Sequence, residues 1–324
     1  MANMALAVLI KALIAFVLLM GGGAYMTWFE RIVIAKIQDR IGPNRVGPRG
    51  LLQPLADGVK LMLKEDVVPH NADRPLHTIA PIIAVTCGLA GIALIPFGPP
   101  ITIAGMTIPM AVSGLSVGIL GILALSSINV YAVVLAGWSS GNKYSLFGAL
   151  RASAQMISYE LALGLCVVAA VIMAGSMELT TIVQAQPWWW CLLSFPLLVI
   201  FMICALAETN RSPFDLPECE SELVAGFHTE YTGMKFAMFF LAEYASMIVI
   251  SALAVTLFLG GYRGPMVDTI PWLGPVWLLL KLICFMFFFV WVRGTLPRFR
   301  YDQLMAFGWK VLMPLTMVYV MFIG

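Results

Sequence analysis

Long apolar runs alternate with polar connections along almost the whole chain. A helix needs about 20 apolar residues to cross a bilayer, and eight runs reach roughly that length. Their approximate limits are 4–29, 78–97, 112–138, 154–174, 188–207, 236–260, 275–292 and 303–323. The pattern predicts an all-α polytopic membrane protein with eight transmembrane helices, built as a single integral membrane domain over residues 1–324.

The composition agrees with a membrane protein. Hydrophobic residues make up 61% of the chain and charged residues 11%, whereas a soluble domain carries about 25% charged residues. The net charge of +2 is too small to indicate binding to nucleic acid. The six cysteines form no CxxC pair and no metal-ligand spacing, so we expect apolar packing residues and no metal site. The first run lacks the features of a cleaved signal peptide, and we expect it to be retained.

Positive charges concentrate in alternate connections. The odd-numbered connections, at about 30–77, 139–153, 208–235 and 293–302, carry fifteen lysines and arginines. The even-numbered connections carry only Arg263. The positive-inside rule therefore predicts that the odd-numbered connections lie in the cytoplasm and that both termini lie outside.

The first connection contains two patterned segments. Its Gly-Pro pairs over 41–50 predict tight turns that present Arg45 and Arg49. Over 51–63 the apolar residues fall on one helical face, which predicts an amphipathic helix at the membrane surface or against a partner protein. Glycines at 21–23 in the first span favour close helix packing, with a flexible span beside a lipid-accessible opening as the alternative.

The connection from Ala207 to Lys235 is unusually acidic. Its carboxylates are Glu208, Asp215, Glu218, Glu220, Glu222 and Glu230. Apolar and aromatic residues are interleaved with them, and two prolines restrict the backbone, so we expect a partly buried segment of defined shape. A solvated acidic loop is the alternative. Buried or neighbouring carboxylates hold protons more tightly, so such a cluster can store and pass protons near neutral pH.

Ionisable residues also occur inside the predicted spans. Glu160 and Glu243 each lie roughly 10 Å in from the cytoplasmic end of a span at 1.5 Å per residue. Lys310 lies at a similar depth, and Lys281 lies nearer the outer side. Such residues are expensive to bury and usually functional. Two acids at matching depth beneath the acidic connection favour a proton path over a set of structural ion pairs.

Several long motifs resemble one known family. They are GPNRVGP, DGVKLMLKED, AGWSSGNKYSLFGALRASAQMISYE, AETNRSPFDLPECESELVAGFHTEY and LPRFRYDQLMAFGWK. With the eight-span layout, they resemble the mitochondrial subunit 1 family, also designated H, of respiratory NADH:quinone oxidoreductase, complex I. The resemblance covers essentially the whole chain. The chain has no Walker loop, dinucleotide fingerprint or nucleophile elbow that would indicate different chemistry.

The resemblance implies a membrane protein that forms much of a quinone tunnel and couples quinone reduction to proton translocation. It implies partners: peripheral-arm subunits carrying FMN and Fe–S clusters, small membrane-arm subunits, antiporter-like subunits and membrane lipid. Residues that match the tunnel motifs are Arg31, Lys36, Arg45, Lys64, Phe227, His228, Arg293 and Arg298. Residues that match the proton-coupling motifs are Glu208, Asp215, Glu218, Glu220, Glu222, Glu230, Glu160 and Glu243.

Three other interpretations stay open at this point. A related membrane protein anchors hydrogenase or formate hydrogenlyase complexes that use no quinone. An independent ion transporter or channel would also use intramembrane acids, and a purely structural anchor would not. We expect a bacterial cell inner membrane, although the same pattern is compatible with the mitochondrial inner membrane.

Overall fold

The structure is a computed structural model that describes residues 2–103, 106–108, 110–112, 114–187, 189–215, 225–267 and 269–324. Within these ranges, eight helical segments are long and apolar enough to cross a membrane. They are α1 (Ala2–Ile37), α3 (Arg74–Ala90) continued by η2 (Gly91–Leu94), α4 (Gly118–Ser139), α5 (Lys143–Ala174), α7 (Trp190–Glu208), α9 (Gly233–Phe258), α10 (Leu273–Thr295), and the last span, which joins α11 (Tyr301–Phe307), η4 (Gly308–Leu312) and α12 (Met313–Ile323). The predicted all-α fold with eight spans is confirmed.

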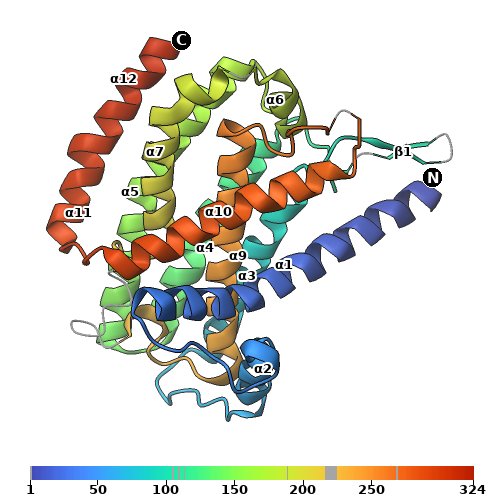
Figure 1. Cartoon of the computed structure of the whole chain (residues 1–324). Helices are drawn as coiled ribbons and strands as arrows, with labels where there is room; N and C mark the ends of the chain where they lie inside the picture. Colours follow the sequence, from blue (N-terminus) through green and yellow to red (C-terminus); the bar gives the residue numbers. More distant parts are fainter. Residues whose placement is uncertain are drawn as a thin grey trace.

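Shorter elements occupy the connections. They are η1 (Pro48–Gly50), α2 (Gln53–Leu63), β1 (Ile101–Ile103), β2 (Met106–Ile108), α6 (Leu179–Ala185) and η3 (Gly226–His228). The two strands pair antiparallel, with Ile101 opposite Ile108, in a hairpin that the sequence pattern did not predict. Its β-branched residues favour strands. Helix α2 lies at one end of the molecule, and α6 and the C-terminus lie at the other (Figure 1).

Two helices extend beyond the predicted limits of their spans. Helix α1 continues to Ile37, so residues 30–37 are helical although the sequence pattern placed them in the first connection. Helix α5 begins at Lys143 instead of near 154, because the Asn142 side chain accepts a hydrogen bond from the Tyr144 amide at 3.0 Å. This side-chain cap satisfies a free amide at the helix start. A search for apolar runs does not detect the polar ends of helices.

Helix α9 forms the centre of the bundle. In its most apolar window 72% of the residues are buried, against 17% in the last span. Glycines let α1 approach α9 closely: a Cβ on Gly23 would lie 3.0 Å from Leu241, and one on Gly22 would lie 3.3 Å from Ile248. These contacts agree with the packing interpretation of the glycine triplet. The outer helices expose apolar faces that suit lipid or partner subunits.

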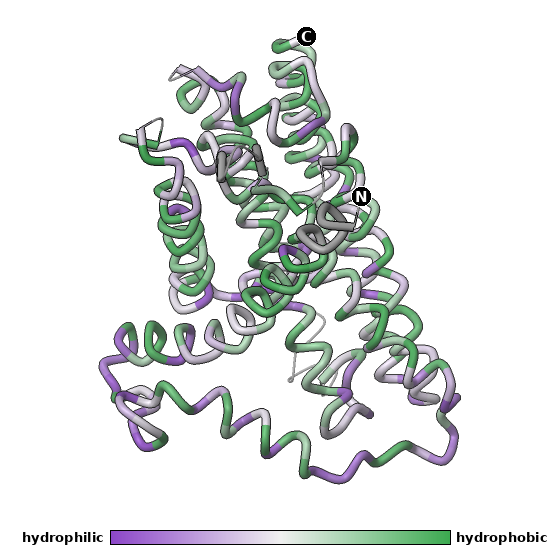
Figure 2. Tube along the Cα trace, turned by 90° about the vertical axis from the view of Figure 1, so that its right-hand side faces the viewer, coloured by the Kyte–Doolittle hydropathy of each residue, from purple (hydrophilic) through white to green (hydrophobic). Residues whose placement is uncertain are grey.

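Hydrophilic residues gather in the connections, and apolar residues dominate the helices (Figure 2). In α2 the exposed large side chains include Leu55, Met62 and Leu63, which are 68%, 67% and 83% exposed. Helix α2 is tied to α1, because Arg31 forms an ion pair with Asp57 at 2.7 Å.

Lys281 of α10 is satisfied by backbone oxygens. Its ammonium group donates to the carbonyls of Leu259, Gly261 and Arg263 at 2.8, 2.9 and 2.7 Å. These carbonyls follow the C-terminus of α9, where a cation interacts favourably with the helix dipole. Lys281 therefore joins α10 to the end of α9 and has a structural role, whereas Lys310 is exposed in η4.

We expect Lys281→Met to destabilise the protein by about 1–3 kcal/mol, because three carbonyl oxygens lose a charged donor. The matched control is Lys143→Met, which removes an exposed lysine at a helix start. The midpoint of thermal unfolding of the detergent-purified protein measures the effect. Equal midpoints for the two variants would contradict the capping role.

Candidate functional site

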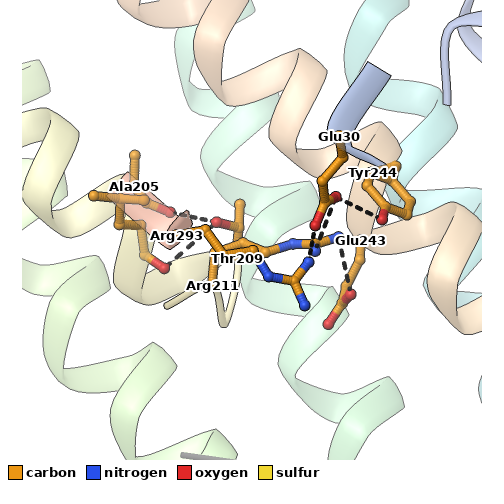
Figure 3. A network of polar contacts seen from close by, with 8 residues as sticks. Glu30, Ala205, Thr209, Arg211, Glu243, Tyr244 and Arg293 are labelled. Carbon is orange, nitrogen blue, oxygen red and sulfur yellow. Dashed lines mark hydrogen bonds and ion pairs between the residues drawn. The ribbon is translucent and has the colours of Figure 1, made fainter. Parts of the chain in front are cut away.

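Arg211 lies at the centre of a buried charge network (Figure 3). Its Nη1 lies 3.5 Å from Glu30 Oε2, and its Nη2 lies 3.5 Å from Glu243 Oε2. Arg293 forms an ion pair with the other oxygen of Glu30, and Tyr244 donates to Glu30 Oε2 at 2.7 Å. The network joins α1, α9 and α10 to the start of the acidic connection. Its two carboxyl and two guanidinium groups balance in charge when all are ionised.

Burial makes this balance necessary. Arg211 is 6% exposed and Glu30 is 5% exposed. A buried charge that loses its partner destabilises a protein strongly. The Arg211 guanidinium also lies 4.3 Å from the centre of the Tyr244 ring, within range of a cation–π interaction.

The first part of the acidic connection is anchored to the segment between α10 and α11. Asp215 Oδ2 pairs with Arg298 Nη2 at 3.0 Å, and the Asp215 side chain is almost fully buried. Phe214 stacks on Phe299 with ring centres 5.7 Å apart, and the Phe299 amide donates to the Pro213 carbonyl at 3.2 Å. These contacts give residues 211–215 a fixed shape.

Gln155 of α5 organises the same turn from the opposite side. It is fully buried, and its Nε2 donates to the carbonyls of Ala207 and Phe214, both at 2.8 Å. One side chain therefore holds both ends of the turn that follows α7. Glu208 and Arg211 both belong to this turn and its start, three residues apart in the sequence.

A second acidic cluster lies where α4, α5 and α7 meet. Glu160 accepts a hydrogen bond from Ser127, and Ser126 Oγ lies 3.5 Å from the same Glu160 oxygen. Ser126 and Glu208 also line the same small cavity. The Glu208 Oε2 atom is buried and has no hydrogen-bond partner among the described residues. Ser126 therefore contacts Glu160 and lies beside the cavity that Glu208 lines.

Two small cavities connect this cluster with Glu243. A cavity of about 50 Å³ is lined by Ser126, Asn129, Glu208 and Ser246, among others. A second cavity of about 30 Å³ is lined by Asn129, Glu208, Ser246 and Glu243, among others. Each exceeds the ~10–15 Å³ that one water needs. Because the cavities share four polar lining residues, Thr209 in addition to Asn129, Glu208 and Ser246, a polar route leads from Glu243 to Glu208 and Ser126.

The far end of the acidic connection packs on α5. Phe227 and His228 are buried in η3, and the Ser145 hydroxyl donates to the Phe227 carbonyl at 3.0 Å. Glu230 accepts a hydrogen bond from Asn142 at 2.7 Å. Their burial makes Phe227 and His228 part of the packed bundle.

Tyr231 links this end to α3 and α4. Its ring stacks on that of His77 with centres 4.0 Å apart, and its hydroxyl lies 3.2 Å from Ser139 Oγ. Burial raises the pKa of Tyr231 to about 12, so the hydroxyl keeps its proton at neutral pH. Lys235 adds an ion pair with Asp66 at 2.9 Å.

Comparison with known proteins identifies the family. A family model described as NADH dehydrogenase matches residues 10–324. The chain belongs to this family. A Thermomicrobium roseum protein, named as the NADH-quinone oxidoreductase subunit designated H, is 52% identical, with 96% of this chain and 94% of that protein covered. A Geobacter metallireducens protein with the same designation, the first of its numbered copies, is also 52% identical, with 98% and 95% covered.

The predicted site residues of this NADH dehydrogenase family member fall into four groups, one of which is the segment with Phe227, His228 and Glu230 that packs on α5. Residues in the buried network or its neighbouring clusters are Glu160, Glu208, Asp215, Glu243, Arg293 and Arg298. Arg31, Lys36, Arg45 and Lys64 are exposed outside it. Glu218, Glu220 and Glu222 lie outside the described residues. Among the described residues, no group of three or more His, Cys, Asp or Glu could hold a metal ion.

Several polar residues of the site were missed from the sequence. Glu30 was counted with the first connection, and Ser126, Ser127 and Asn129 lie inside an apolar run. A signal existed in each case, because an acid beside apolar Phe29 and the polar SSIN segment in a span are both unusual. Arg211 was noticed only as a loop cation, and its contacts with two helices required the tertiary structure.

We expect Gly148→Ala to disturb the far end of the acidic connection. A Cβ at Gly148 would lie 2.7 Å from Gly226 Cα and 3.0 Å from the Phe227 amide, so the backbone of η3 must move. Overpacking of this kind costs about 1–3 kcal/mol. Gly164→Ala in the same helix is the control, because nothing lies within 4 Å of its Cβ. Thermal unfolding midpoints measure both, and a Gly148→Ala protein as stable as the control would contradict the close contact.

Proposed function

We propose that this chain is the membrane subunit of a proton-pumping NADH-quinone oxidoreductase that couples quinone reduction to proton translocation. The observation that carries the proposal is the position of Arg211. Its guanidinium links Glu30 with Glu243, and a polar-lined route continues from Glu243 to Glu208 and Glu160. A charge change at the acidic connection can therefore be transmitted into the bundle. The names of the relatives support the same reaction.

The proposed chemistry assigns different tasks to the chain and its partners. Reduction of a quinone to a quinol takes up two electrons and two protons. FMN and Fe–S clusters in partner subunits supply the electrons. The carboxyl groups of this chain supply or position protons beside the quinone headgroup, with Asp215 and its partner Arg298 at the anchored start of the acidic connection.

Coupling follows from the low dielectric of the site. A charge created or removed beside Arg211 acts strongly on Glu243, because few waters screen it. Proton movement through the two cavities then responds to that field, with Ser126, Asn129 and Ser246 as hydrogen-bonding groups along the route. Such a response shifts an existing equilibrium and needs no large movement of the helices.

We propose that the quinone tail enters near α1 and α2. A quinone is apolar and long, so it must come from lipid, and the exposed apolar side chains of α2 suit the membrane surface. The Arg31–Asp57 ion pair holds α2 against α1, and Trp28 donates to the Arg49 carbonyl at 3.2 Å. Arg31, Lys36, Arg45 and Lys64 lie on this side as the proposed basic lining, with Arg293, Phe227 and His228 deeper in the chain's fold and the exposed Arg298 beside Asp215.

We expect Glu160→Gln and Glu208→Gln, made separately, to lower proton translocation per NADH oxidised by at least about threefold, because each removes an exchangeable proton from the route. Glu208→Asp keeps the carboxyl group and is the matched control. The measurement is proton uptake by vesicles during inhibitor-sensitive NADH:quinone turnover of the assembled complex. Unchanged proton translocation per NADH oxidised in both Gln variants would contradict the proposed route.

We propose a bacterial cell inner membrane as the location, with the acidic connection in the cytoplasm. We expect an impermeant maleimide to label Lys143→Cys in inside-out vesicles and Thr269→Cys in right-side-out vesicles, as the positive-inside rule requires. Both positions are exposed, and they lie in connections on opposite sides of the membrane under this proposal. Peptide mass spectrometry separates them from the native cysteines. The reverse pattern would overturn the proposed orientation.

A further inference from the structure

A larger cavity lies at the end of the bundle opposite the acidic connection. It has a volume of about 400 Å³ and is lined by Gln186, Cys191, Leu259, Gly260, Arg263 and Val267, among others. Cys191 is at the start of α7, whereas Glu208 ends the same helix, so the two sites are separated by about 25 Å at 1.5 Å per residue. The volume is within the range of about 300–1,000 Å³ that small-molecule sites occupy. The proton route uses none of these residues.

Gln186 leaves one acceptor unused at this cavity. Its side chain is almost entirely inside the protein, with the residue 6% exposed. Nε2 donates to the carbonyls of Thr256 and Leu257, both at 2.9 Å, which fixes the orientation of the amide. Oε1 is buried and has no hydrogen-bond partner among the described residues. A buried acceptor without a donor is unfavourable, so the site is incomplete without a group that donates to it.

Arg263 supplies a fixed positive charge at the same cavity. Its Nη1 donates to the carbonyls of Gln184 and Gln186 at 3.2 and 2.8 Å. These contacts hold the guanidinium against the segment between α6 and α7. Its remaining donors suit an anion, because a guanidinium presents five N–H groups and Nη1 carries only some of them. The cavity therefore offers a cation and an acceptor together.

The cavity lies at the level where a membrane meets water. Helix α7 begins there at Trp190, and the neighbouring Trp189 and Trp272 are 47% and 61% exposed. Exposed tryptophans are enriched at membrane–water interfaces. We propose that this cavity binds the headgroup of a membrane phospholipid. Its phosphate contacts Arg263, and its ammonium or hydroxyl group donates to Gln186 Oε1.

The two contacts, with Arg263 and with Gln186 Oε1, predict that the cavity prefers some phospholipid headgroups over others. Phosphatidylethanolamine and phosphatidylglycerol carry both a phosphate and an N–H or O–H donor. Phosphatidylcholine carries the phosphate but has no donor in its headgroup. The unused Gln186 acceptor therefore discriminates between these headgroups, whereas Arg263 alone would accept all three.

Cys191 provides a built-in reporter of occupancy, because its thiol is free and exposed at the cavity. The purified complex is reconstituted into lipid nanodiscs of two compositions. One contains only phosphatidylcholine, and in the other phosphatidylethanolamine with the same acyl chains replaces part of the phosphatidylcholine. Site-resolved mass spectrometry then follows alkylation by a small maleimide. We expect Cys191 to react roughly tenfold more slowly with phosphatidylethanolamine present, the factor that one hydrogen bond to a charged group supplies. Cys284, exposed in α10, is the internal control.

The anion that contacts Arg263 could be a lipid phosphate or a free phosphate ion. Adding inorganic phosphate to the phosphatidylcholine nanodiscs distinguishes the two. Protection by inorganic phosphate alone, equal rates in both discs, or protection that persists after lipid is stripped by detergent would each overturn the proposal. The last result would mean that a neighbouring protein of the complex fills the cavity. The comparison of lipids needs no variant, so it stays decisive even if a substitution impairs assembly.

Paired substitutions test the two contacts. Arg263→Lys keeps the charge and is expected to keep most of the protection. Arg263→Gln keeps a donor for the carbonyls but removes the charge, and protection of Cys191 is expected to be lost. Gln186→Met removes the acceptor, so the difference between the two lipids is expected to disappear. A preference for phosphatidylethanolamine that survives Gln186→Met would overturn the assigned role of Oε1.

Discussion

The burial of Arg211 between Glu30 and Glu243 is the interaction on which the site depends. A guanidinium in this position is tolerated only because carboxyl groups from two different helices face it. That requirement fixes where α1 and α9 lie relative to the start of the acidic connection. It also makes each of the three charges sensitive to the others. The buried, charge-balanced network therefore holds these segments together and also responds to a change in charge at any of its members.

The two ends of the bundle satisfy their cations in different ways. At the acidic end, Arg211 and Arg293 pair with carboxyl groups that can gain or lose protons. At the other end, Lys281 and Arg263 donate to backbone carbonyls, which do not titrate. The first arrangement can respond to a change in protonation, whereas the carbonyl contacts of the second hold its cations in fixed positions. This contrast supports placing proton coupling at the acidic end.

The polar route has a simple physical basis. Helices α4, α5 and α7 carry serines and carboxyl groups on the faces that meet, so the packing leaves small polar cavities beside Glu208 instead of an apolar core. Cavities of this size and polarity can hold water. Gln155 and the Asp215–Arg298 pair keep the adjoining turn in place. The route therefore rests on fixed backbone positions.

The sequence by itself determined the class, the eight spans and the acidic connection, because burying a span in lipid demands a long apolar run. It also identified Glu160 and Glu243, since an acid inside such a run is conspicuous. It could not show that α1 reaches Ile37 or that α5 starts at Lys143, because polar helix ends look like loops. Only the tertiary structure paired Glu30 with Arg211, residues 181 positions apart in the chain. Such partners are chosen by helix packing, and no local pattern in the sequence records that choice.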